Sequence, residues 1–95
     1  MIDRNKKLLI GQLDKKFEKI SGLTEATTPP SGWIYSIRTA LNMSLTQLAR
    51  RLKKTAQSVK EIEEREQSRN ITLKKLAEVA EALDLSFYYC FLPKE

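Results

Sequence analysis

Apolar residues recur along most of the chain at the spacing of amphipathic α-helices. The first such pattern covers residues 4–20, where the apolar positions follow one another at steps of four, four and three residues. These positions are Leu9, Leu13, Phe17 and Ile20. We expect an N-terminal helix with one apolar stripe, which packs on the rest of the chain, packs across a dimer, or forms an arm that binds another protein.

A segment rich in helix-breaking residues follows. Residues 21–32 include Gly22, Gly32 and the consecutive prolines Pro29 and Pro30. Paired prolines stop a helix, because proline lacks an amide donor and restricts the residue before it. We therefore expect a linker here, and we see no other obvious boundary in the chain.

Residues 33–85 predict four shorter helices with recognisable ends. Asn42 is suited to a left-handed cap after the first of them. The second begins at Ser44, which forms a capping-box pattern with the glutamine three residues later, and Thr55 and Thr72 can cap the third and fourth. The apolar positions expected to face the core are Trp33, Ile34, Ile37, Leu41, Leu45, Leu48, Ala49, Leu52, Val59, Ile62, Leu73, Leu76, Ala77, Val79, Ala80 and Leu83.

The end of the chain changes character. Residues 86–92 are rich in aromatic side chains and stop before Pro93, which predicts a β-strand. No second strand candidate exists, so the simplest partner is the same strand of a second copy across a two-fold axis. Alternatively, the segment packs as a coil over the helices. The predicted dimer interface consists of Phe87, Tyr88, Tyr89, Cys90 and Phe91.

Composition then excludes several classes of function. The 95 residues suffice for a single domain, residues 1–95, with a modest core. The chain has no histidine, no metal-ligand spacing and no glycine-rich phosphate loop, so we expect no enzyme, no metal site and no cofactor. No apolar run approaches the roughly 20 residues that span a bilayer. A single cysteine suits the reducing cytoplasm, and a net charge of +5 favours an anionic partner.

Residues 44–63 carry the most specific pattern. Two helices that cross closely need a small residue at the crossing, and Ala49 provides it. Val59 and Ile62 follow ten and thirteen residues later, the spacing of a helix-turn-helix. From about residue 33 to residue 85 the sequence resembles the lambda-repressor-like, xenobiotic-response-element class of DNA-binding domains. The resemblance implies an all-α fold of five helices, here with an extra N-terminal helix and the C-terminal strand.

Two positions depart from that class. The turn between the two helices usually holds a left-handed glycine, and here it holds Lys53, at a cost of about 1 kcal/mol. The first residue of the first helix is often a glutamine that binds phosphate, and here it is Leu45. One contact with the DNA backbone is therefore in doubt.

The second helix of the pair is expected to enter the major groove by its N-terminal end. If Val59 points inward, Gln57 faces outward, where it can pair with adenine. The expected base contacts are Ala56, Gln57, Ser58, Lys60 and Glu61. Glu61 either accepts from cytosine or is only solvated.

Contacts with the sugar-phosphate backbone are expected on both sides of that helix. Between residues 44 and 60 there are five basic residues and no acidic one, which suits phosphate binding, although a solvated basic face is the alternative. The expected backbone contacts are Ser44, Gln47, Arg50, Arg51, Lys53, Lys54, Thr55, Arg65, Ser68, Arg69 and Asn70. Four glutamates between residues 61 and 66 predict that the helix leaves the groove there.

The whole chain also resembles the mobile mystery protein A family. The resemblance rests on N-K-K-L-L-I-G-Q-L-D near the N-terminus, on P-P-S-G-W-I-Y-S-I-R-T-A-L-N-M-S, on Q-L-A-R-R-L and on the aromatic tail ending F-L-P. It implies a bacterial regulator. From the helix-turn-helix pattern and the predicted dimer, we expect sequence-specific binding to a palindromic operator and repression of the protein's own operon. The resemblance also implies a neighbouring gene for a Fic-domain protein. The alternative function is therefore an antitoxin that inhibits such a partner, with DNA binding secondary.

Overall fold

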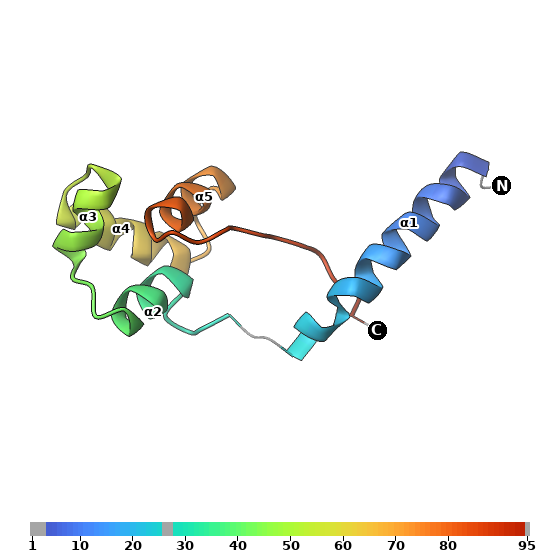
Figure 1. The fold of residues 1–95 in the computed structure, drawn as a ribbon, viewed down its shortest axis with the longest axis horizontal. Helices are drawn as coiled ribbons and strands as arrows, with labels where there is room; N and C mark the ends of the chain where they lie inside the picture. Colours follow the sequence, from blue (N-terminus) through green and yellow to red (C-terminus); the bar gives the residue numbers. More distant parts are fainter. Residues whose placement is uncertain (1–3, 26–27, 95) are drawn as a thin grey trace. The chain divides into compact units, whose positions relative to one another are not determined.

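The computed structural model describes residues 4–25 and 28–94, which form helices joined by turns and extended segments (Figure 1). The elements are α1 (Arg4–Ile20), a 3₁₀ helix η1 (Ser21–Glu25), α2 (Trp33–Ala40), α3 (Leu45–Leu52), α4 (Ala56–Gln67) and α5 (Leu73–Ala82). The helices divide between two compact units, one holding α1 and η1 and the other, residues 28–88, holding α2 to α5. None of the helices described is both long and apolar enough to cross a membrane.

In the unit that holds α1, the predicted N-terminal helix is confirmed over residues 4–20. The predicted linker begins with η1, whose first residue, Ser21, donates its hydroxyl to the backbone oxygen of Glu18 at 2.9 Å. Leu9 and Leu13 of the predicted apolar stripe are about half exposed, at 57% and 50%. The N-terminal part of the stripe is therefore exposed, whereas Phe17 and Ile20 are half-buried.

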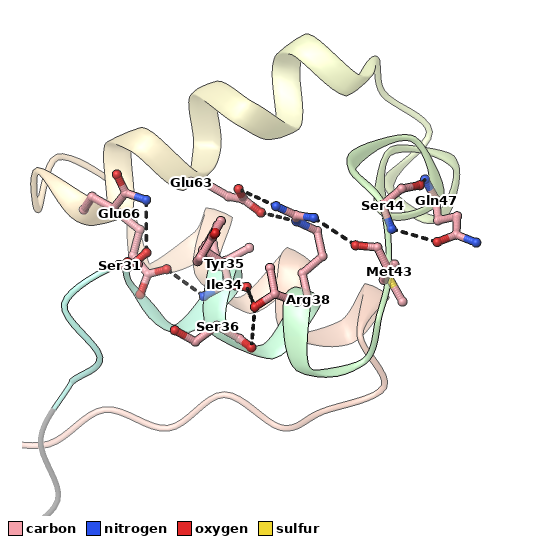
Figure 2. Close-up of polar contacts among 12 residues, drawn as sticks. Ser31, Ile34, Tyr35, Ser36, Arg38, Met43, Ser44, Gln47, Glu63 and Glu66 are labelled. Carbon is pink, nitrogen blue, oxygen red and sulfur yellow. Dashed lines mark hydrogen bonds and ion pairs between the residues drawn. The ribbon is translucent and has the colours of Figure 1, made fainter.

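The helix ends in the second unit follow the capping signals of the sequence. Ser44 Oγ accepts from the Gln47 amide at 3.1 Å, and Gln47 Oε1 accepts from the Ser44 amide at 2.7 Å, which completes the capping box (Figure 2). Thr55 and Thr72 cap α4 and α5 in the same way through their hydroxyl oxygens. Asn42 has a φ of 56°, as expected of a left-handed cap.

The core of this unit lies between α2, α3, α4 and α5. Its centre is formed by three fully buried side chains, Leu48, Val59 and Val79. The other buried apolar residues are Ile34, Ala49, Ile62 and Leu83, and the residues partly buried against them are Ile37, Met43, Leu45, Leu52, Ile71, Leu76 and Ala82. The helical periodicity thus identified most of the core.

Four residues expected in the core are exposed instead. Trp33, Leu41 and Leu73 expose 48%, 56% and 49% of their surfaces, and Ala77 is also exposed. The first three lie at or just beyond the end of a helix of eight or ten residues. Such short helices present about two turns to the core, so the buried stripe is narrower and shorter than the apolar pattern.

The prediction of a C-terminal strand is wrong for this chain. Residues 85–94 have no regular secondary structure, and no strand occurs in the described ranges that could pair with them. An isolated strand would leave its amide and carbonyl groups without ladder partners. Tyr88 and Phe91 are almost fully exposed, at 87% and 86%. Residues 85–88 line a hollow between α2 and α5.

Two glutamates of α4 fasten α2 to it. Glu66 accepts hydrogen bonds from the amides of Trp33 and Ile34 at 2.8 and 2.9 Å, which satisfies two of the free amides in the first turn of α2. Glu63 is buried and accepts from Nε of Arg38 at 2.6 Å and from Nη2 at 3.2 Å (Figure 2). The sequence had suggested only that the acidic end of this helix turns away from DNA, and it gave no sign of these internal roles.

Candidate DNA interface

The turn between α3 and α4 is built as a helix-turn-helix. Ala49 is 3% exposed where α3 packs on α4, so a larger side chain would separate the two helices. Lys53 adopts the left-handed conformation expected at this position, with a φ of 56°. Its amide bonds to the Arg50 oxygen at 3.2 Å and the Lys54 amide bonds to the Ala49 oxygen at 2.9 Å, which closes the end of α3.

One face of the N-terminal half of α4 is open to solvent. Val59 and Ile62 are buried, which fixes the rotation of the helix and leaves Gln57, Lys60 and Glu61 exposed. Ala56 and Ser58 are half-buried beside them. The arrangement brings together three exposed side chains able to donate or accept at base edges. Their contact with bases remains a prediction.

Three of the residues expected to contact the DNA backbone also form the caps of helices. The hydroxyl oxygens of Ser44 and Thr55 already accept from backbone amides, and so does Oε1 of Gln47. The side-chain amide nitrogen of Gln47 lies outside the capping box. Because nitrogen is the donor end of that amide, it is the part of this set best suited to meet a phosphate.

Arg50 and Arg51 take different roles although they are neighbours on α3. Arg50 is exposed and lines a shallow polar hollow with Thr39, Asn42, Ser44 and Gln47. Arg51 donates through Nη1 to the Ala82 oxygen at 3.2 Å, at the end of α5. We therefore assign Arg51 to holding α3 against α5 and keep Arg50 among the proposed DNA contacts.

The loop between α4 and α5 gathers a second basic group. Arg65, Arg69 and Asn70 line one hollow with Lys75, the residue whose amide bonds to the cap of α5. Arg69 has a positive φ of 60°, and Ser68 donates its hydroxyl to the Arg65 oxygen at 3.1 Å. The hydroxyl of Ser68 thus contributes to the helix end, while the charged side chains line the hollow.

Lys75 is a basic residue of this hollow that the sequence pattern did not single out. It lies 3.0 Å from a carboxylate oxygen of Glu78, and this hydrogen bond lowers the pKa of the Glu78 carboxyl below its ordinary value. The sequence signal for Lys75 was its position three residues after Thr72, which places it in the first turn of a capped helix.

Comparison with known proteins identifies the class. The profile of a family described as helix-turn-helix matches residues 34–90, which is more than half of the chain. Searches among curated proteins and among solved structures give no match. The match runs from the second residue of α2 past the end of α5, so it includes both the turn at Lys53 and the exposed face of α4. The chain belongs to the helix-turn-helix family, in its lambda-repressor-like class, and is a DNA-binding regulator.

Proposed function

We propose that the protein is a dimeric repressor that binds a palindromic operator near its own promoter. The observation that carries this proposal is the open N-terminal face of α4, where Gln57, Lys60 and Glu61 are exposed together above a rigid core. A recognition helix needs polar side chains on its outer face and a fixed rotation, and α4 has both.

The side chains on this face suit different base edges. Gln57 can form two hydrogen bonds with N6 and N7 of adenine, and the methyl group of Ala56 can contact the methyl group of thymine. Glu61 can accept from N4 of cytosine, and Lys60 can reach guanine or a phosphate. We assign the main role in sequence choice to Gln57, because it is exposed and belongs to the first turn of α4.

Basic residues before and after α4 supply the contacts that do not depend on sequence. Arg50, Lys53 and Lys54 precede its N-terminus, and Arg65 and Arg69 lie at its C-terminal end; all five are exposed. Each phosphate that a basic side chain neutralises releases counterions, so binding weakens as salt increases. The two groups would hold α4 at a fixed depth and register in the groove.

Two copies related by a two-fold axis would place two α4 helices one turn of DNA apart, about 34 Å. Such an arrangement reads a palindrome and increases affinity through the second half-site. A repressor that binds its own promoter region in this way blocks transcription by occupancy, so its action needs no cofactor.

The test is fluorescence anisotropy of the full chain with its own upstream DNA and with a scrambled duplex of equal length, over a salt series. We expect tight binding to the upstream DNA alone, with an affinity that falls steeply as salt increases. Equal and weak binding to both duplexes would contradict the proposal, because α4 would then not be reading sequence.

A further inference from the structure

We infer that the hollow between α2, α5 and the start of the tail binds a small organic cation, in which an ammonium group is attached to an apolar body. The inference goes beyond the proposed function and rests on none of the residues expected to touch DNA. Every residue that lines this hollow belongs to the unit of residues 28–88. The site therefore lies within a single unit of the chain.

The first observation is the size and the apolar lining of the hollow. Its volume is about 400 Å³, which is within the range of pockets that hold small organic molecules. Most of the residues that line it are aliphatic residues of α2 and α5 or aromatic residues, and Ile37, Leu76 and Val79 are among the aliphatic ones. A lining of this kind favours a ligand with an apolar body over an inorganic ion.

The second observation is that three aromatic side chains line the hollow. Trp33 is the first residue of α2, and Phe87 and Tyr88 belong to the start of the tail. Trp33 and Tyr88 expose 48% and 87% of their surfaces, so a ligand can reach both rings. The faces of aromatic rings attract cations, and several rings around one cavity are a recurrent way to bind quaternary ammonium groups.

The third observation is the charge of the hollow. Glu66 is the only charged residue among the described residues that line it, and Arg69, three residues further along α4, lines an adjacent hollow. The carboxylate of Glu66 accepts from the backbone amides of Trp33 and Ile34, which are neutral, and each oxygen has a further lone pair. An anionic ligand would meet a like charge here, whereas a cation would supply the counter-charge. Charge complementarity therefore selects a cation.

The first experiment uses Trp33 as the reporter, because it is the single tryptophan of the chain and lines the hollow. Benzyltrimethylammonium is titrated into the full chain, without DNA, at two protein concentrations, and benzyl alcohol and phenylacetate are the neutral and anionic controls. We expect a saturable change in fluorescence with the cation. Benzyl alcohol should bind at least about tenfold more weakly, and phenylacetate should not bind.

The second experiment removes the charge, the space or one ring. Glu66→Gln should weaken binding of benzyltrimethylammonium at least about tenfold, and Glu64→Gln, at an exposed position of the same helix, is its control. Ala80→Leu should abolish binding because it fills the hollow, whereas Ala77→Leu, on an exposed side of α5, should not change it. Tyr88→Ala should weaken binding severalfold and leaves the core untouched, so it tests the site even if Glu66→Gln does not fold. Circular dichroism verifies the fold of each variant.

Four results would overturn the inference. They are the absence of a saturable change in fluorescence, equal affinities for benzyltrimethylammonium and benzyl alcohol, unchanged binding by folded Ala80→Leu or by Tyr88→Ala, and an apparent affinity that falls as the protein concentration rises. The last result would assign the hollow to a second copy of the chain, which would compete with the cation for it.

Discussion

Arg38 connects three parts of the DNA-binding unit through a single guanidinium group. It donates to both carboxylate oxygens of Glu63 and, through Nη1, to the Met43 oxygen at 2.8 Å (Figure 2). The hydrogen bond to Glu63 raises the pKa of Arg38 above its ordinary value, although burial of the guanidinium group acts in the opposite direction. These hydrogen bonds fix α2 relative to α4 and to the start of α3.

We expect Arg38→Leu to lower the free energy of unfolding by about 3–5 kcal/mol, because it leaves the Glu63 carboxylate buried without its partner. The double variant Arg38→Leu, Glu63→Leu should lose much less than the sum of the two single changes. Urea unfolding followed by circular dichroism measures all three. Additive losses would show that the two side chains do not act as a pair.

Gly32 is held in a conformation that other residues rarely adopt, with a φ of 86°. A Cβ atom there would lie 2.8 Å from Oε1 of Glu66, the carboxylate that caps α2. We expect Gly32→Ala to lower the free energy of unfolding by about 2 kcal/mol, through backbone strain and a displaced cap. Gly11→Ala is the control, because nothing lies within 4 Å of its added Cβ, and it should be neutral or stabilising. Equal losses in both variants would contradict this explanation.

Two adjacent arginines of helix α3 are expected to have different roles, one in the stability of the fold and the other in DNA binding. We expect Arg51→Ala to lower the free energy of unfolding by about 0.5–1.5 kcal/mol, since it loses the hydrogen bond to Ala82, and to leave the dissociation constant for DNA unchanged. Arg50→Ala should do the reverse, weakening all DNA sequences alike and reducing the salt slope by about 1. Thermal unfolding and anisotropy of both variants test this, and exchanged phenotypes would refute the assignment.

The boundaries of the helices were largely predictable from the sequence, because Ser44, Thr55 and Thr72 are local signals whose hydrogen-bond partners are three residues away. The roles of Glu63 and Glu66 were not, because their partners are about 30 residues away in the chain and only the fold brings them together. The tail was mispredicted for a related reason. Its aromatic composition favours a strand, but a strand exists only where another strand pairs with it.

At the scale of the whole molecule, the four helices of residues 28–88 form the DNA-binding unit, and α1 supplies a separate apolar face. The sequence predicted the class of this unit from the spacing of Ala49, Val59 and Ile62, and the family match confirms that class. The sequence did not decide what α1 packs against, because the periodicity of an amphipathic helix shows that one face is apolar and does not say what covers that face.

The central claim is that the N-terminal face of α4 reads base sequence, and one side chain tests it most directly. The measurement is the ratio of dissociation constants for the upstream DNA and a scrambled duplex, compared between the wild-type chain and Gln57→Ala at one salt concentration. The account predicts a loss of about 1–3 kcal/mol on the upstream DNA, with binding to the scrambled duplex unchanged. An equal loss on both duplexes would contradict it, because Gln57 would then contribute affinity without reading sequence.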